Sequence, residues 1–325
     1  MAKTFGFEST TDEVLEGVNL AGKRILVTGA SAGLGVETVR SLAAHGANVV
    51  GTARDLGKAK RALEQAYSQM AKGASIDLVE VDLASLKSVR KGADEILAQG
   101  KRFDVIIANA GVMACPQGKT SDGFETQFGT NHLGHFVFVN KLVPLLNSGG
   151  RIVSLSSAGH RICDVSIEDP NFEHTEYAPF TAYGRSKTAN ILYAVALDKR
   201  LKGRGIRATA LHPGGIQTEL GRHLTPQLIE EMQARWRAAA AAGGGQQEQM
   251  RFKTIPQGTA TAVWAACVAP AEAVGGHYCE DCQVAEVNDK EAPRRGVKSY
   301  ALDPAHAEAL WAKSEEMVGE KFSIS

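Results

Sequence analysis

Short apolar runs rich in β-branched residues alternate with longer helical segments along most of the chain, from about Lys23 onward. Two of these runs, Ile25-Leu26-Val27 and Val105-Ile106-Ile107, are unbroken, which is typical of strands buried on both faces. We expect strands at 24–28, 48–51, 77–81, 104–108, 151–155 and 207–211, and helices at 36–45, 56–72 and 86–98. This alternation predicts an α/β fold in which helices cover both faces of one doubly wound parallel sheet.

Length and composition limit the classes of protein to consider. The chain has 325 residues, of which 44% are hydrophobic and 22% charged, enough to bury one sizeable core. No repeat or linker divides the sequence, so residues 1–325 are expected to form a single domain. Lysine plus arginine equal aspartate plus glutamate, at 36 each, so the chain lacks the positive charge of a nucleic-acid binder.

Five cysteines are scattered along the chain, at positions 115, 163, 267, 279 and 282. Their small, odd number indicates a reduced, cytoplasmic protein rather than a disulfide framework. Cys279 and Cys282 form a CxxC pair, which is half of a zinc site, but no second pair follows at ligand spacing. We therefore expect no metal site, with both cysteines in or beside a strand.

No segment has the character of a membrane anchor. The N-terminal region is acidic, with Glu8, Asp12 and Glu16, and has no long apolar run. The most apolar later stretch, 259–273, is too short to span a bilayer. We expect a cytoplasmic protein that makes no membrane contact.

Three segments depart from the alternation of strand and helix. Residues 161–179 are acidic and irregular. Residues 218–256 contain a helix at 226–242, with five consecutive alanines, then Gly243-Gly244-Gly245 and a polar run. Strong helix formers followed by glycines favour a mobile flap at 218–256 over a core element. Residues 303–319 have an amphipathic pattern and are expected to form a C-terminal helical extension.

A glycine-rich turn, Thr28-Gly-Ala-Ser-Ala-Gly-Leu-Gly35, lies between the first strand and the first helix. Gly29, Gly33 and Gly35 permit a tight turn and a close approach of the backbone to a ligand. The N-terminus of the following helix offers free amides and a positive dipole end to a pyrophosphate. Glycines serve many turns, but this position favours a dinucleotide-binding fold of the Rossmann type.

The end of the second strand is expected to recognise the adenosine ribose. Enzymes that use NAD place a carboxylate there, about 20 residues after the glycines. In this chain that position is Ala53, followed by Arg54, which gives room and donors for a 2′-phosphate. Asp55 leaves an alternative open, because it could pair with Arg54 or the strand could be shifted. We expect NADP(H) to be preferred over NAD(H), with Asp82 bonding the adenine or capping the next helix.

Six motifs occur in the order found in short-chain dehydrogenases/reductases. They are Thr28-Gly-x-x-x-Gly-x-Gly35, Asn109-Ala-Gly111, Asn131, Ser157, Tyr183-x-x-x-Lys187 and Pro213-Gly214. The match runs from about Lys23 to Asp281, most of the chain. The chain thus resembles this family, which implies a nicotinamide cofactor and oxidoreduction of a carbonyl or alcohol.

The resemblance implies that the catalytic residues are Asn131, Ser157, Tyr183 and Lys187. Tyr183 and Lys187 are four residues apart, so on a helix they share one face. A free phenol has a pKa of about 10, and a nearby ammonium with the oxidised nicotinamide would favour its phenolate. Tyr183 would then exchange a proton with the substrate oxygen, which Ser157 would orient. Asn131 would hold a water that links Lys187 to solvent.

The resemblance also implies the positions that bind the cofactor. These are Gly29, Ser31, Gly33, Leu34, Gly35, Arg54, Asp82, Leu83, Asn109, Ala110, Gly111, Tyr183, Lys187, Pro213, Gly214, Ile216 and Thr218. Asn109 is expected to brace the sheet beneath the cofactor, and Thr218 to contact the carboxamide. For the histidines at 132, 135, 160 and 212 we favour packing or surface roles.

The spacing of 26 residues between Ser157 and Tyr183 exceeds that of the family members with the shortest loop. With Asp169-Pro-Asn-Phe172 and Ala189-Asn-Ile-Leu192, it makes the chain similar to the subgroup around retinol dehydrogenases, WW-domain oxidoreductase and protochlorophyllide reductase. Family members often pair through the helices that carry Asn131 and Tyr183, which implies a homodimer or homotetramer.

The substrate is left open by these motifs. Apolar residues at helical spacing between 220 and 236 favour a hydrophobic ketone, aldehyde or secondary alcohol, although such a stripe also serves plain packing. Reduction of a carbon–carbon double bond is an alternative, because the Tyr–Lys pair can serve it too. A non-catalytic NADP-binding regulator is a further alternative, which the presence of serine, tyrosine and lysine together disfavours.

Overall fold

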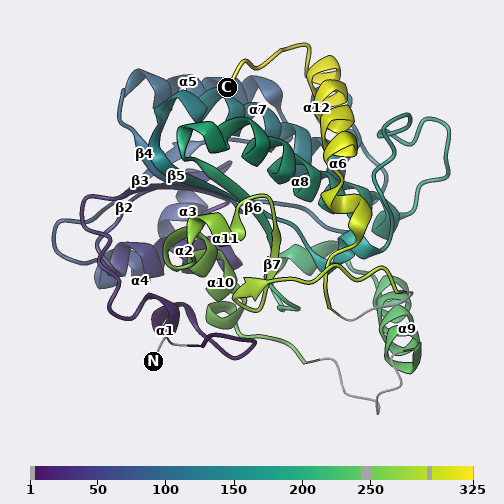
Figure 1. The fold of residues 1–325 in the computed structure, drawn as a ribbon, viewed down its shortest axis with the longest axis horizontal. Helices are drawn as coiled ribbons and strands as arrows, with labels where there is room; N and C mark the ends of the chain where they lie inside the picture. The colour runs from purple at the N-terminus through teal and green to yellow at the C-terminus, as the bar shows by residue number, and fades with distance from the viewer. Residues whose placement is uncertain (1–3, 243–250, 291–294, 325) are drawn as a thin grey trace.

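The computed structural model describes residues 4–242, 251–290 and 295–324 (Figure 1). In this part of the chain one eight-stranded sheet has the order β3-β2-β1-β4-β5-β6-β7-β8. Strands β1 to β7 pair in parallel, and β8 pairs antiparallel with β7. The strands are β1 (Arg24–Thr28), β2 (Asn48–Ala53), β3 (Ser75–Glu80), β4 (Phe103–Ala108), β5 (Leu146–Leu155), β6 (Arg207–His212), β7 (Tyr278–Glu280) and β8 (Gln283–Val284). This order confirms the doubly wound, Rossmann-type fold that the sequence predicts.

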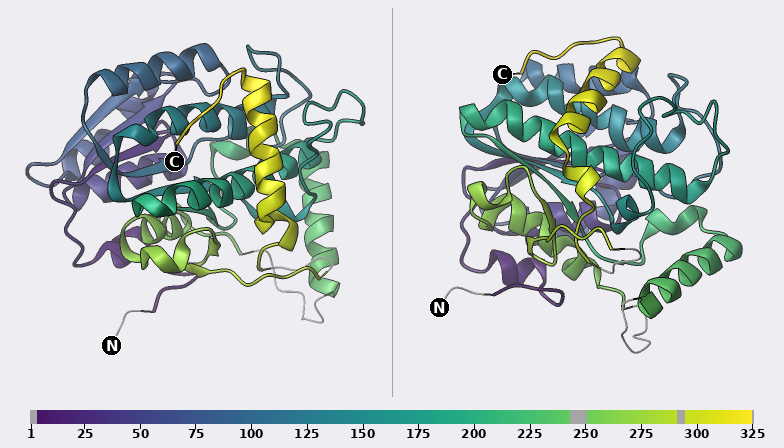
Figure 2. Two further views of the ribbon diagram at one scale, coloured as in Figure 1. Left: turned by 45° about the horizontal axis from the view of Figure 1, so that its top comes forward. Right: turned by 45° about the vertical axis from the view of Figure 1, so that its right-hand side comes forward.

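Helices cover both faces of the sheet, as Figures 1 and 2 show. One face is covered by α5 (Leu86–Ala98), α7 (Gly134–Leu142), α8 (Pro179–Leu201) and α12 (Pro304–Val318). The other is covered by α1 (Thr11–Leu15), α2 (Gly33–Ala44), α4 (Glu64–Gln69), α10 (Ile255–Val263) and α11 (Ala271–Val274). Helices α3 (Leu56–Ala62) and α6 (Thr126–Phe128) lie in connections, and α9 (Pro226–Ala242) stands apart from the sheet. Within the described ranges, no helix combines the length and hydropathy that a membrane span requires.

Neighbouring residues of the central strand β1 supply opposite faces of the sheet. Ile25 and Val27 pack in the layer that contains α2 and α10, whereas Leu26 packs in the layer that contains α5 and α7. All three side chains are fully buried. The unbroken apolar run is therefore required because both faces of this strand are covered.

The structure shifts several of the predicted bounds. The helix expected at 56–72 is broken at Leu63, where φ is −96° and ψ is 6°, and it ends at Gln69 because Met70 is extended. The break places the Leu63 side chain in the core. The strand expected at 151–155 begins earlier, since Leu146 already pairs with Phe103 before an irregularity in the register. Strands β7 and β8 and helix α1 lie outside the predicted elements.

The irregular segments contain both expected and unexpected elements. Helix α9 occupies the residues 226–242 in which the sequence predicts a helix, whereas residues 255 and 256 belong to α10. Gly243-Gly244-Gly245 lie outside the described residues. In the acidic segment, the Asp169 carboxylate accepts hydrogen bonds from the backbone of Glu173 and the hydroxyl of Thr175. Cys279 lies in β7 and Cys282 in the turn to β8, as expected.

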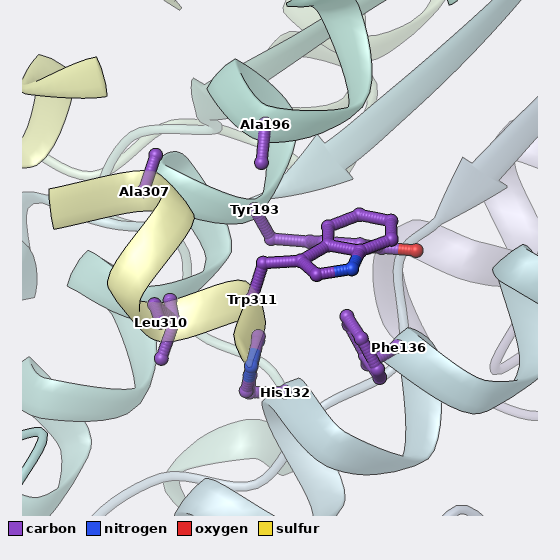
Figure 3. A pocket seen from close by; sticks show the side chains of 7 residues that line it. All are labelled: His132, Phe136, Tyr193, Ala196, Ala307, Leu310 and Trp311. Carbon is purple, nitrogen blue, oxygen red and sulfur yellow. The ribbon is translucent and has the colours of Figure 1, made fainter. Parts of the chain in front are cut away.

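The C-terminal helix α12 is fixed to α7 and α8 by aromatic contacts. The Trp311 ring centroid is 5.0 Å from that of Phe136 and 5.9 Å from that of Tyr193, and the Arg200 guanidinium lies 3.9 Å from it. Figure 3 shows the indole beside both rings, at a narrow void that has no room for water. The predicted extension is therefore part of the hydrophobic core.

Replacing Trp311 should test this contribution of α12. We expect Trp311→Ala to lower the free energy of unfolding by about 3–5 kcal/mol, because it removes a large side chain that is only 5% exposed. Urea denaturation measures the change, with Tyr67→Ala as a matched control on an aromatic that is 38% exposed. Equal losses in the two variants would contradict the assignment of α12 to the core.

Candidate active site

The glycine turn between β1 and α2 is built for close backbone approach. Gly29 and Gly33 have φ of +77° and +55°. A Cβ at Gly35 would lie 2.0 Å from the Gly29 carbonyl oxygen, so only glycine allows α2 to start against the end of β1. The N-cap of α2 is Ala32, which supplies no side-chain cap, so the first amides of the helix are available to an anion. These features fit the pyrophosphate of a dinucleotide.

The ends of β1 and β4 are joined by polar contacts beneath this turn. The backbone amides of Asn109 and Ala110 donate to the Thr28 hydroxyl, at 2.9 and 3.0 Å. The Asn109 side chain donates to the Thr28 carbonyl at 2.8 Å. Asn109 thus braces two strand ends, as the sequence suggests, and Ala110 contacts the position where a Gly29 side chain would be.

The adenosine end of the predicted site lies where β2 and β3 finish. Ala53 is the last residue of β2, paired with Glu80, and Arg54 follows it as an exposed side chain. Asp55 accepts from the amide of Lys58 and caps α3, and no ion pair joins it to Arg54. The alternative of a shifted strand is therefore disfavoured, and Arg54 is left facing solvent at the strand end.

Asp82 and Leu83 follow β3 in this region. The Asp82 carboxylate accepts from the Ala84 amide at 3.0 Å, whereas the N-cap of α5 is Ser85. The alternative in which Asp82 caps that helix is therefore wrong. The carbonyl oxygen of Leu83 lies 2.4 Å from where a Cβ at Gly134 would be, so Leu83 packs against the start of α7.

Tyr183 and Lys187 lie on one face of α8, beside the end of β5. The Lys187 ammonium donates to the Leu155 carbonyl at 2.9 Å and lies 5.7 Å from the centre of the Tyr183 ring. Ser157 follows β5, and its hydroxyl accepts from the Gly159 amide at 3.0 Å. A Cβ at Gly159 would be 2.8 Å from the Tyr183 ring and 3.5 Å from the Ser157 hydroxyl, so both side chains flank this glycine.

Burial shifts the pKa values of the two catalytic candidates in opposite directions. It raises the pKa of Tyr183 to about 12, while a hydrogen bond with the Ser157 side chain acts the other way. Burial lowers the pKa of Lys187 to about 8, so the ammonium is still the main form at neutral pH. The site therefore holds a phenol next to a cation in a nearly dry environment, which is suited to proton transfer.

Asn131 lies in a π-helical turn, η1 (Gly129–Leu133), which precedes α7. Its side-chain oxygen accepts from the Val112 amide at 2.8 Å. Its amide group donates to the Val112 carbonyl and to the Ser186 hydroxyl, both at 2.9 Å. Asn131 thus ties the segment after β4 to α8, and a Cβ at Gly111 would lie 3.1 Å from its side-chain oxygen and 3.5 Å from the Lys187 ammonium. π-Turns of this kind are frequent at functional sites.

The segment after β6 returns over the glycine turn. A Cβ at Gly33 would lie 3.3 Å from the methyl group of Thr218, and Leu34 and Ile216 both lie close to Gly258. Ser31 is half-buried within the glycine turn. Thr218 also caps the short helix η5 (Glu219–His223). The structure thus brings the predicted residues of the two loops together.

A buried ion pair supports this segment, and sequence reasoning missed it. The Lys253 ammonium bonds the Asp281 carboxylate at 2.7 Å, and Lys253 is 4% exposed. Lys253 pairs with Ile216, and its aliphatic stem lies 2.7 Å from where a Cβ at Gly214 would be. Gly214, which follows Pro213, also has φ of +104°. The position requires glycine because a side chain would meet Lys253 and because L residues rarely adopt this φ. No local pattern indicates a pair between residues so far apart in the sequence.

Three of the four histidines named in the sequence analysis lie beside the candidate catalytic residues, whereas His132 bonds Ser314 of α12 at 2.7 Å in the aromatic core. Burial lowers their pKa values, to about 3 for His132 and His212 and about 4 for His135 and His160. His212 accepts from the Ala158 amide at 3.2 Å, which links the end of β6 to the turn after Ser157. All four are packed, as expected, and the rings of His135 and His160 also bond the backbone carbonyls of Asn131 and Ser157.

Comparison with known proteins identifies the family. The sequence profile of the short chain dehydrogenase family matches residues 23–228. The chain is 38% identical to short-chain dehydrogenase/reductase prx1 of Penicillium roqueforti and 40% identical to retinol dehydrogenase 14 of Mus musculus, each match covering 92% of this chain and 86% of the relative. The crystal structure of an uncharacterized protein from Mycobacterium paratuberculosis is 33% identical, covers 94% of this chain and 96% of its own, and superposes with a TM-score of 0.69. The chain therefore belongs to the short-chain dehydrogenase/reductase family of oxidoreductases.

Proposed function

We propose that the protein is an NADP(H)-dependent oxidoreductase that interconverts a carbonyl and an alcohol on an apolar small molecule. The observation that carries the proposal is the arrangement of Ser157, Tyr183 and Lys187, with a phenol between a hydroxyl and a buried ammonium. The family uses nicotinamide cofactors, and the bound nicotinamide supplies or accepts the hydride.

The three side chains have distinct roles in this reaction. In the reductive direction, Tyr183 gives its proton to the carbonyl oxygen as the carbon receives the hydride, and the reverse holds for oxidation. The Lys187 ammonium stabilises the phenolate that remains. Ser157 donates a hydrogen bond to the substrate oxygen and holds it near Tyr183. Asn131 keeps the Val112 segment beside Lys187 and supports the water relay that we expect there.

The cofactor preference rests on the end of β2. Ala53 leaves space at the position where a carboxylate would meet a 2′-hydroxyl, and Arg54 offers a guanidinium at the adjoining exposed position. A 2′-phosphate carries a charge that a guanidinium can bind with paired hydrogen bonds. We therefore assign NADP(H) as the preferred cofactor.

The flap favours an apolar substrate. Leu220 and Leu224 precede α9, Leu228 and Met232 lie on it, and all four are only partly buried against the protein. Ile229 beside them is 37% exposed. A helix at the edge of the fold with partly exposed apolar side chains suits a cover for a hydrophobic ligand. The similarity to retinol dehydrogenase 14 makes retinaldehyde the first probe to test.

Tyr183→Phe should remove turnover and leave NADPH binding nearly intact, since the phenol is needed for the proton and the ring is retained. We expect a loss of at least about 100-fold in kcat, the usual contribution of a general acid. Absorbance at 340 nm follows turnover of retinaldehyde, and quenching of tryptophan fluorescence follows binding. Turnover that survives this change would refute the catalytic assignment.

The Lys187 ammonium should make stability depend on pH. Its folded pKa of about 8 is below the unfolded value of 10.5, so between these values the unfolded chain holds a proton that the folded protein has released. The free energy of unfolding therefore rises with pH across this window. The stability that uncharged Lys187 contributes above pH 10.5 is lost as pH falls through about 8. From pH 7 to pH 10, the stability of the wild type should rise by roughly 2 kcal/mol relative to Lys187→Met. Urea titrations in which the wild type and Lys187→Met change equally with pH would contradict a buried lysine with a lowered pKa.

Arg54→Ala should weaken the binding of NADPH much more than the binding of NADH. We expect the affinity for NADPH to fall about tenfold or more, because a charged hydrogen-bond partner is removed, and the affinity for NADH to change little. Arg102→Ala is the matched control, because Arg102 is an exposed arginine that immediately precedes β4, at the opposite end of the sheet. Equal losses for both cofactors would exclude recognition of a 2′-phosphate by Arg54.

A further inference from the structure

A C-terminal segment, Gly296–Tyr300, crosses the turn that carries Ser157, and we refer to it as the strap. The Gly296 amide donates to the Glu280 carboxylate at 2.7 Å. The Arg161 guanidinium donates to the Gly296 carbonyl through two of its nitrogens. Val297 is fully buried and pairs with Val287. The strap is therefore anchored both to the end of β7 and to the end of the turn η3 (Ala158–Arg161).

The strap contacts the turn through His160. The Lys298 amide donates to His160 Nε2 at 3.3 Å, and the Tyr300 hydroxyl donates to the His160 carbonyl at 2.6 Å. A backbone amide can only donate, so Nε2 is the acceptor and the ring hydrogen is on Nδ1. His160 Nδ1 then donates to the Ser157 carbonyl at 2.7 Å. The ring is fully buried, and burial lowers its pKa to about 4, so it remains neutral in this arrangement at ordinary pH.

Fixing His160 fixes the residues that meet Tyr183. The turn from Ser157 to His160 is tight, and Gly159 within it presses against the Tyr183 ring, 2.8 Å from where its Cβ would be. A shift of this turn would move the Ser157 hydroxyl relative to the phenol. Small displacements of catalytic groups are costly, because the reacting atoms must stay within hydrogen-bond distance.

We propose that Lys298 and Tyr300 are positioning residues that act through His160 to hold Ser157 against Tyr183. This inference rests on the proposed function, which assigns a role in catalysis to Ser157. Among the described residues, no hydrogen bond joins the strap to the glycine turn or to Arg54. Loosening the strap should therefore lower kcat and leave cofactor affinity unchanged.

The test uses a proline substitution, which removes the backbone N–H that bonds His160, and an alanine control that keeps it. Lys298 has φ of −73°, which a proline adopts, and the preceding Val297 is extended, as a residue before proline prefers. Lys298→Pro removes the amide that bonds His160, whereas Lys298→Ala loses the same side chain and keeps the amide. We expect kcat for retinaldehyde to be about three- to tenfold lower in the proline variant than in the alanine variant, with NADPH affinity within about twofold. Equal kcat values would overturn the proposal.

Two further measurements keep the outcome decisive. In a Ser157→Ala background, Lys298→Pro should cause no further loss of kcat, whereas independent, additive losses would mean that the strap acts elsewhere. Hydrogen exchange needs no activity: peptides that span 156–163 should exchange faster in Lys298→Pro than in Lys298→Ala, with 28–36 unchanged.

If the wild type turns over no carbonyl, the proposed function fails, and hydrogen exchange still decides whether the strap holds the turn. Should the proline variant not fold, Tyr300→Phe replaces it, because it removes one bond to His160 and keeps the ring.

Discussion

The Thr28 hydroxyl joins three parts of the candidate active site at the end of the first strand. It accepts the amides of Asn109 and Ala110, so its own hydrogen goes to His135 Nε2, 2.9 Å away. His135 then donates from Nδ1 to the Asn131 carbonyl, also at 2.9 Å. Burial lowers the pKa of His135 to about 4, which keeps the ring neutral so that it can accept and donate at once. The start of the glycine turn, the end of β4 and the π-turn are thereby held in one arrangement.

Around this junction, burial controls the chemistry. The same dry environment raises the pKa of Tyr183 and lowers that of Lys187, so burial disfavours the charged form of each group. A phenolate at Tyr183 therefore depends on the nearby ammonium and on hydrogen bonds from Ser157. The positions of these groups therefore matter as well as their identity, since a short displacement would weaken both effects. This dependence explains why three separate loops, after β4, β5 and β6, are tied together by buried histidines and by the Lys253–Asp281 pair.

The sequence predicts those parts of the structure that local patterns determine. The apolar runs identify β1 and β4, and α5 has the predicted bounds because its amphipathic face and the capping Ser85 agree. The glycine turn and the Tyr–Lys spacing place the candidate residues on the correct elements. What the sequence does not predict depends on distant contacts. Strands β7 and β8 are too short to leave a pattern, and the bond from Lys298 to His160 joins residues 138 apart in the chain.

Transfer of deuterium from NADPH tests the central claim most directly. The protein would be incubated with NADPH deuterated on either face of nicotinamide C4, and with an apolar substrate that carries both a carbonyl and a conjugated double bond. Mass spectrometry and NMR of the product locate the label. Our account predicts one deuterium on the carbinol carbon with one of the two labelled cofactors and none with the other, because the bound nicotinamide presents a single face to the carbonyl carbon. Deuterium on a saturated carbon of an intact carbonyl compound would show double-bond reduction and contradict the account, as would an alcohol that carries no label with either cofactor.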